Sequence, residues 1–391
     1  MGKTLSEIAQ DLQRAENKVQ LIYAFNGVGK TRLSRKFKEL ISPKTNSEED
    51  GDSTNKILYY NAFTEDLFYW DNDLENDVDC KLEIHPNSFT DWILKDEGKE
   101  KDIAAYFTHY TNSKIVPNFS SDFSSVSFSI PGEGESTPAQ IKISKSEESN
   151  FIWCVFYSML ESVIDELNET KDNRGTPRFD GLEYIFIDDP VSSLDENHLI
   201  ELAVDLAKTI KTSKTESGIK FIITTHNPLF FNVLFNEFKN NDKDRDKDKN
   251  KRKYRKCYLK KFEDGTHELQ KQANDSPFAY HLYVLQELKN AIFYNSIKKY
   301  HFNLLRNLLE KTATFLGYPR WGELLKEMDD KYATRLINLS SHSSLSTDES
   351  SILTDEDKEI IKNIVDFFEK TYHFKIEPNS NVASIPTEVS N

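Results

Sequence analysis

The sequence predicts an α/β protein in which a mixed sheet covered by helices is followed by a mainly α-helical C-terminal domain. A β-rich run over 19–24 leads through a glycine-rich loop into a helical stretch over 30–41. Further buried strands are expected at 184–187 and 220–224, and helical apolar spacing extends from about Phe278 to Leu325. We therefore expect two domains, residues 1–264 and 265–391, with a disordered tail from about residue 377.

Composition limits the classes of function. The 391 residues carry a formal charge of −15, so a nucleic-acid site would have to be a local basic patch. Three widely spaced cysteines form neither a disulfide framework nor a zinc motif, which is typical of a reducing cytosol. We expect a cytoplasmic protein without membrane contact, since the sequence has no apolar run of membrane-spanning length.

Residues 24–31 have the pattern of a phosphate-binding loop between a strand and a helix. Glycines let the backbone amides turn toward phosphate groups, and the helix N-terminus adds partial positive charge. Lys30 is expected to neutralise the β and γ phosphates and Thr31 to bind Mg²⁺. The expected nucleotide-binding residues are Asn26, Gly27, Val28, Gly29, Lys30 and Thr31.

Two later strands end in candidate catalytic residues. The strand at 184–187 runs into Asp188 and Asp189, and the strand at 220–224 runs toward His226. With Asp195 in the segment 192–195, this order resembles that of ABC-type P-loop NTPases. The resemblance implies that Asp188 holds Mg²⁺, that Asp189 is the general base for NTP hydrolysis, and that His226 senses the γ-phosphate.

The segment 143–147 resembles the signature motif of those NTPases, although Ser146 replaces a glycine. The resemblance implies that Ser144 contacts the γ-phosphate held by another protomer, so a head-to-head dimer is expected, and that Asp195 is a further nucleotide-binding residue. Asp189 is shorter than the usual glutamate, which predicts slow turnover. Asn61 is the nearest candidate for the usual lobe-switching glutamine, and the sequence does not distinguish ATP from GTP.

Function beyond NTP hydrolysis is expected in the C-terminal domain, where Arg306 and Glu310 share one helix face. Arg306 and Glu310 form either an ordinary ion pair or, together with His342, a catalytic group. His342 taken by itself is typical of a histidine in a surface loop. Metal-free RNA cleavage needs a base for the 2′-hydroxyl, an acid for the leaving oxygen and a cation at the phosphorus. Glu310 and His342 can share the proton transfers, while Arg306 contacts the phosphate.

The surroundings of these residues favour an RNA substrate. Residues 280–340 carry nine Lys or Arg against six Asp or Glu, a net charge of +3 on an acidic chain. Nearby aromatic residues can stack on unpaired bases, although most of them are typical of a core: Tyr294, Tyr300, Phe302, Tyr318 and Trp321.

With the phosphate loop at 25–31, Arg306, Glu310 and His342, the chain resembles the bacterial anticodon nucleases over nearly its whole length. The resemblance implies cleavage of tRNA, namely tRNA-Lys, on the 5′ side of the wobble base, leaving 2′,3′-cyclic phosphate and 5′-hydroxyl ends. It also implies an antiviral role without a metal in the nuclease site. Inhibition by a type I restriction-modification complex, activation by a phage-encoded peptide, and dTTP as a regulatory nucleotide are further implications. Residues 280–289 correspond to the region linked to anticodon choice.

Two other functions stay open on the sequence alone. An ABC-type DNA-repair or anti-phage ATPase could use the same head, with a C-terminal domain that binds DNA or a partner. A metal-dependent nuclease could use the aspartates between 242 and 248. Those aspartates alternate with lysine in the charged run 239–256, which is more typical of a solvated loop.

Overall fold

The computed structural model describes residues 2–43, 56–61, 68–72, 80–85, 88–111, 114–131, 140–190, 196–240, 254–262, 264–271, 280–326, 328 and 353–373. The chain divides into two compact units, Met1–Phe278 and Ala279–Asn391. The division falls after Phe278 rather than after residue 264, because strand β10 (His267–Lys271) pairs with β9 (Tyr254–Lys261). The tail from about residue 377, predicted to be disordered, lies outside the described residues.

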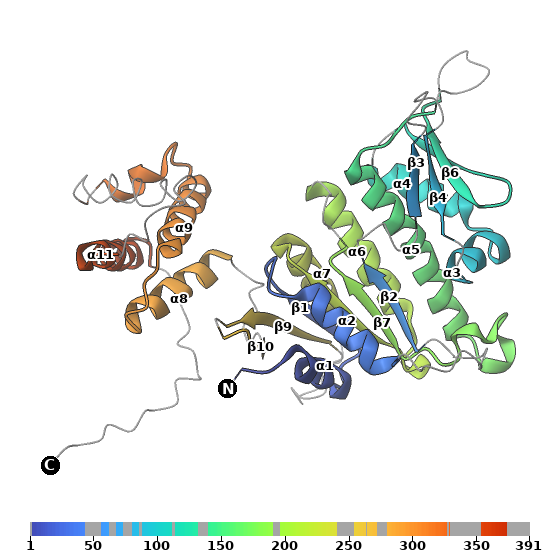
Figure 1. Ribbon diagram of the computed structural model, residues 1–391, viewed down its shortest axis with the longest axis horizontal. Coiled ribbons are helices and arrows are strands. Elements are labelled where there is room, and N and C mark those ends of the chain that lie inside the picture. The colour runs from blue at the N-terminus through green and yellow to red at the C-terminus, as the bar shows by residue number, and fades with distance from the viewer. Residues whose placement is uncertain are drawn as a thin grey trace. The chain divides into compact units, whose positions relative to one another are not determined.

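A six-stranded sheet forms the centre of the first unit, in the order β10-β9-β1-β8-β7-β2 (Figure 1). β1 (Val19–Tyr23), β7 (Tyr184–Asp188), β8 (Lys220–Thr225), β9 and β2 (Ile57–Asn61) are parallel, and β10 is antiparallel to β9. The predicted mixed sheet is therefore confirmed. Its central strands are buried on both sides, which explains their continuous apolar sequence.

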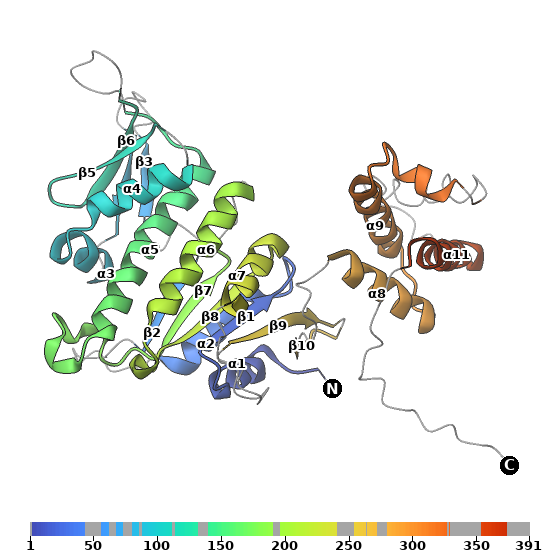
Figure 2. The ribbon, with the colours of Figure 1, turned by 180° about the vertical axis from the view of Figure 1, so that it is seen from behind.

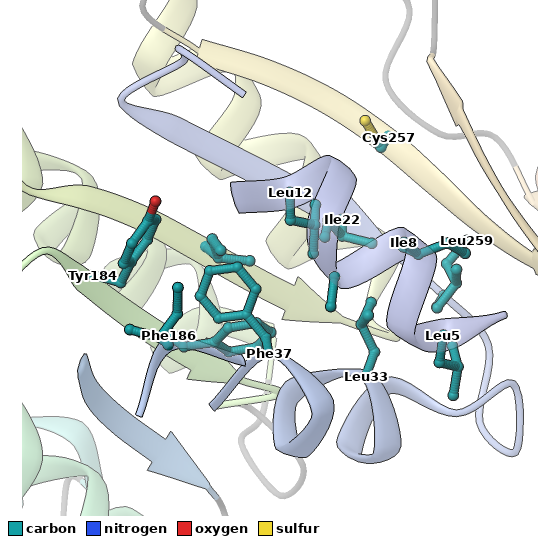
Figure 3. Packing of buried hydrophobic residues seen from close by; sticks show 14 of the residues in the cluster. Leu5, Ile8, Leu12, Ile22, Leu33, Phe37, Tyr184, Phe186, Cys257 and Leu259 are labelled. Carbon is teal, nitrogen blue, oxygen red and sulfur yellow. The ribbon is translucent and has the colours of Figure 1, made fainter. Parts of the chain in front are cut away.

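Helices cover both faces of this sheet (Figures 1 and 2). On one face, α1 (Leu5–Arg14) and α2 (Lys30–Ile41) insert Leu12 and Phe37 against Ile22 and Phe186, as Figure 3 shows. On the other face, Tyr23 contacts Phe231 of α7 (Pro228–Asn240), with ring centroids 5.8 Å apart. The helix α6 (Glu196–Thr212) packs beside α7.

A second, four-stranded antiparallel sheet was not predicted from the sequence. Its order is β3 (Phe68–Asn72), β4 (Cys80–Ile84), β6 (Ser125–Ser129) and β5 (Val116–Phe119). Phe128 of β6 packs against Phe107 of α4 (Glu100–Thr111) and Phe151 of α5 (Lys145–Asn168). Between β4 and α4 lie a short α-helix, Ser88–Asp91, and a π-helical turn, Trp92–Asp96.

The second sheet is followed by a long helix. Residues 141–143 contribute no strand, and Gln140 forms an isolated bridge to Ser129. The helix α5 begins at Lys145, because Ser144 is its N-cap. Short 3₁₀ turns at Lys171–Asn173, Pro177–Phe179 and Thr215–Ser217 complete the loops of the first unit.

The second unit is helical, as predicted. It contains α8 (Tyr280–Phe293), α9 (Tyr300–Leu316), the 3₁₀ helix η7 (Trp321–Leu325) and α11 (Asp355–Tyr372). Their apolar faces form a separate core that includes Leu285, Phe302, Leu309 and Ile364. Thr354 caps α11, since its hydroxyl accepts a hydrogen bond from the Asp357 amide. Within the described residues, no helix is both long and apolar enough to cross a membrane.

Candidate nucleotide and nuclease sites

The candidate nucleotide site lies where three neighbouring parallel strands end. β8 pairs with β1 on one side and with β7 on the other. Because carboxyl ends of parallel strands meet at one edge, the loop after Tyr23, the acids after Ile187 and the residues after Thr225 converge. Segments far apart in the sequence thus meet at one edge of the sheet.

The phosphate loop has the backbone geometry that its glycines allow. Gly27 and Gly29 have φ values of 78° and 110°, in the left-handed region. The amide of Ala24 donates to the carbonyl of Thr225 (3.0 Å), which anchors the loop to β8. Ala24 is fully buried in the core, so a methyl group fits where the motif usually has glycine.

Lys30 lies inside this loop and is only 7% exposed. Its Nζ donates to Asn26 Oδ1 (3.0 Å) and to the Ala24 carbonyl (3.2 Å), and it lies 3.4 Å from Asp189 Oδ2. The ammonium is thus held at the start of α2, where backbone amides also favour anions.

Asp188 is 2% exposed and is surrounded by hydroxyl groups. Thr224 and Ser34 donate to its two carboxylate oxygens, and Thr31 also hydrogen-bonds to it. Burial raises the pKa of the Asp188 carboxyl, and the bonds from Thr224 and Thr31 oppose that rise. A carboxylate beside a threonine hydroxyl is a set of hard oxygen ligands that fits Mg²⁺.

Asp189 turns away from Asp188 and toward β8. Its φ of 52° is unusual for a non-glycine residue, and its amide donates to the Thr224 carbonyl (3.0 Å). The ring Nδ1 of His226 lies 2.8 Å and 2.7 Å from the two carboxylate oxygens. Burial acts to raise the pKa of Asp189, but the His226 bonds and the Lys30 charge outweigh it and lower the pKa.

Two contacts at this site were missed in the sequence. Ser34 lies one turn after Lys30, and its hydroxyl bridges Asp188 and the Tyr59 hydroxyl (2.8 Å). A polar residue on the otherwise apolar face of α2 was the available signal. His267 of β10 is 3% exposed, and its Nε2 lies 2.9 Å from the Val28 carbonyl in the phosphate loop. No local pattern indicates this second contact.

The other sequence-predicted residues of the nucleotide site lie apart from this group or outside the described residues. Ser144 is exposed and caps α5: its hydroxyl accepts from the Glu147 amide (3.3 Å) and donates to the Glu147 carboxylate (2.7 Å). Asn61 ends β2 in register with Asp188. Asp195 lies outside the described residues.

In the second unit, Arg306 and Glu310 are brought together on α9. Arg306 Nε donates to Glu310 Oε1 (2.8 Å), and the two side chains are 38% and 44% exposed. The buried face of α9 holds Leu305 and Leu309, so the pair lies on its more exposed side. A solvent-facing pair of this kind contributes little to stability, about 0.3–0.5 kcal/mol. His342 lies outside the described residues.

The aromatic residues proposed to stack on bases divide into two groups. Phe302 is fully buried, and Trp321 packs partly against the core of the second unit. Tyr294, Tyr300 and Tyr318 are exposed. No group of three or more metal-ligating side chains occurs within the described ranges, and residues 242–248 fall outside them.

Comparison with known proteins identifies the family. The AAA domain family matches residues 97–370, more than half of the chain. The anticodon nuclease of Escherichia coli is 49% identical over 411 aligned residues, which cover 97% of this chain and 100% of that protein. This chain belongs to the anticodon nuclease family.

In this member of the anticodon nuclease family, the AAA match begins after the phosphate loop but includes Asp188, His226, Arg306 and Glu310. Solved structures with distant similarity are Smc head domains. The Smc head bound to the C-terminal winged-helix domain of ScpA is 9% identical, covers 67% of this chain and 91% of its own, and has a TM-score of 0.34. The SMC head domain from Thermotoga maritima is 11% identical, with coverages of 67% and 90% and a TM-score of 0.30.

Proposed function

We propose that this chain is a nucleotide-regulated endoribonuclease that cuts tRNA within the anticodon loop. The observation that carries the proposal is the end-to-end similarity to the anticodon nuclease of Escherichia coli. The ion-paired Arg306 and Glu310 support it, because they lie in a helical unit distinct from the one that holds the phosphate loop.

The cleavage chemistry is internal transfer at one phosphate. The 2′-oxygen bonds to the phosphorus and loses its proton, while the bond to the 5′-oxygen breaks and that oxygen gains a proton. Glu310 and His342 divide these two proton transfers between them. Arg306 stabilises the charge on phosphorus, since a guanidinium matches the geometry of phosphate oxygens. The products are a 2′,3′-cyclic phosphate and a 5′-hydroxyl, without a metal in this site.

The substrate and its control follow the family resemblance. We infer that the RNA is tRNA-Lys, cut 5′ of the wobble base as an antiviral response that is toxic to the host cell. A type I restriction-modification complex would hold the enzyme inactive in the cytoplasm, and a phage-encoded peptide would release it. dTTP would act as a regulatory nucleotide.

The first unit supplies the switch. Thr31 and Asp188 would hold Mg²⁺, which offsets phosphate charge when ATP or GTP is bound. Lys30 contacts the β and γ phosphates, and residues 26–29 donate backbone amides. Asp189 accepts a proton from the attacking water, and His226 senses the γ-phosphate while it hydrogen-bonds to the Asp189 carboxylate. Ser144 and Asp195 contact the nucleotide of a second protomer in a head-to-head dimer.

The test is tRNA cleavage without free metal. The full chain is first incubated with NTP and Mg²⁺, and bulk tRNA is then added with excess EDTA. Cuts in the anticodon loop with cyclic-phosphate ends support the proposal. Metal-dependent nicking of DNA, with tRNA left intact, would instead support a DNA-directed ATPase or nuclease.

Variants distinguish two roles for Arg306 and Glu310, a catalytic pair and an ordinary ion pair. Glu310→Gln should lower cleavage ~10²–10⁴-fold, because the amide cannot transfer the proton. Glu369→Gln is a matched control, since Glu369 is ion-paired with Lys289 (2.8 Å) in the same unit. We expect this control to cleave tRNA at nearly the wild-type rate.

A further inference from the structure

Exposed apolar side chains are concentrated in the second unit. In the part of the chain that the structure describes, nine large hydrophobic residues are exposed, and six of them lie between residues 293 and 318. The most exposed are Phe315 (89%), Phe293 (76%) and Tyr294 (63%). Apolar side chains grouped in this way on a surface usually mark a binding site.

Part of this group is concentrated where α8 passes into α9. Phe293 ends α8, and its ring meets that of Tyr294 edge-on, with centroids 5.0 Å apart. Tyr300 begins α9, and its ring lies against that of His301, with centroids 4.0 Å apart. Lys298 and Lys299 lie between the two helices. We call Phe293, Tyr294, Lys298, Lys299 and Tyr300 the α8–α9 turn surface.

The turn has a defined conformation that presents these side chains. His301 is 2% exposed, and its Nδ1 accepts a hydrogen bond from the Lys298 amide (2.7 Å). Asn295 has a φ of 48°, and its amide bonds to the Ile292 carbonyl, which closes the end of α8. The Tyr300 ring therefore rests on a buried, hydrogen-bonded histidine, so little conformational freedom is lost on binding.

Charge favours one kind of occupant for this surface. Residues 280–326 contain seven Lys or Arg and three Asp or Glu, a net charge of +4, whereas the whole chain carries −15. A second copy of the same basic surface would be repelled, whereas a polyanion would be attracted. Cations interleaved with exposed aromatic rings are the usual means of binding single-stranded nucleic acid.

One ring of this surface, Tyr300, lies on the same helix as Arg306 and Glu310. Tyr300 and Glu310 are on the same helix and are separated by about 15 Å along its axis and by about 80° around it. Phe315, by contrast, is about 140° around the helix from Glu310. Of these two rings on α9, Tyr300 is therefore the nearer to the side that carries Glu310.

We propose that the α8–α9 turn surface stacks on unpaired bases of the RNA whose backbone is cut at Arg306 and Glu310. The inference rests on the proposed nuclease function and adds a surface that holds the substrate. Stacking is tolerant of base identity, so this surface supplies affinity and placement rather than sequence choice.

Binding to a non-cleavable RNA tests the proposal. The probe is a fluorescent anticodon stem-loop with 2′-O-methyl groups in the loop, and the full chain is titrated by anisotropy. Phe293→Ala combined with Tyr294→Ala should weaken binding roughly tenfold or more. Phe293→Tyr with Tyr294→Phe keeps both rings and should bind within about twofold of wild type. Lys298→Gln with Lys299→Gln should reduce the salt dependence, by a slope of about 0.7 for each lost phosphate contact.

Phe315→Ala is the control, because it removes an even more exposed ring (89%) near the other end of α9. It should leave RNA affinity unchanged. Wild-type RNA affinity in the Phe293/Tyr294 alanine variant would overturn the inference. The inference would also be overturned if that variant lost self-association but kept its RNA binding, because the surface would then be a contact between two copies of the chain. Failure of the wild-type chain to bind the stem-loop at all would instead count against the proposed function itself.

Discussion

His226 Nδ1 lies within 2.8 Å of both carboxylate oxygens of Asp189, although the two residues follow different strands. A third bond runs from the His226 amide to Asp189 Oδ1 (3.2 Å). The proposed base and the proposed γ-phosphate sensor are thus a single hydrogen-bonded unit, and the unusual backbone of Asp189 places its carboxylate there.

Asp189→Asn should slow NTP hydrolysis ~10²–10⁴-fold, because an amide cannot accept the proton of water. Nucleotide affinity should change little. His226→Ala should resemble it, and the double variant should be scarcely worse than either single one, since the two act together. Phosphate release and nucleotide binding are measured on the same samples. Hydrolysis at the wild-type rate in Asp189→Asn would assign the base to another group.

Lys30→Ala should abolish triphosphate binding, since Lys30 is the buried cation of the phosphate loop. Lys36→Ala is the control: Lys36 is on the same helix but half exposed, and it is ion-paired with Glu39 (2.7 Å). Calorimetric titration with ATP and with GTP compares the nucleotide affinity of the two variants with that of the wild type. Normal binding by the Lys30 variant would refute the assignment of the loop.

His342→Ala should lower tRNA cleavage ~10²–10⁴-fold, with NTP hydrolysis and melting temperature nearly unchanged. Arg306→Lys should also be poor, because an ammonium cannot make the two-pronged contact of a guanidinium. A triple variant at Arg306, Glu310 and His342 should be little worse than the worst single one. A His342 variant that melts normally and cleaves at full rate would remove His342 from the mechanism.

Ser144 offers a test of the second protomer. Ser144→Ala should lower stability by about 1 kcal/mol through loss of the α5 cap. Ser144→Asp keeps a good cap but places a negative charge where a γ-phosphate is proposed to bind. It should therefore retain the melting temperature and lose NTP hydrolysis. Normal hydrolysis in Ser144→Asp would restrict Ser144 to its capping role.

His267→Phe should reduce nucleotide affinity, because the Val28 carbonyl would lose its buried donor at a cost of about 1–3 kcal/mol. His267→Gln can restore a donor and should recover part of that affinity. Gln270→Ala, three residues along β10, is the control, since the Gln270 side chain donates to Glu268 (2.9 Å) on the same strand. Equal affinity in all three variants would mean that the His267 bond does not position the loop.

The sequence predicted those parts of the head whose signals are local. Gly27 and Gly29 predict left-handed backbone conformations in the loop. The apolar runs of β1, β7 and β8 predict strands that are buried on both sides. The order of these motifs along the chain then places Lys30, Asp188 and His226 at one edge. Helical periodicity likewise predicted the second unit and the shared face of Arg306 and Glu310.

The rest depended on contacts between distant segments. β10 is polar at most positions, so its sequence does not indicate a strand, and it forms one by pairing with β9. For this reason the sequence predicted a domain boundary after residue 264, before β10. The segment 143–147 carries both a resemblance to a nucleotide-contacting motif and a Ser-x-x-Glu capping box, and the structure forms the cap. His267 and Val28 are 239 positions apart in the sequence, so no short window of sequence contains this pairing.

The central position of β1 has a consequence for how the protein is made. β1 is synthesised within the first 23 residues, but its neighbours β8 and β9 follow only at 220–225 and 254–261. Pairings between such distant segments form slowly, and domains tend to fold as the ribosome releases them. The strand that carries the phosphate loop therefore stays unpaired through most of translation. β10 is the last strand of the sheet to be synthesised, and the helical unit follows it. The first unit, which holds the phosphate loop, is therefore able to fold before the second.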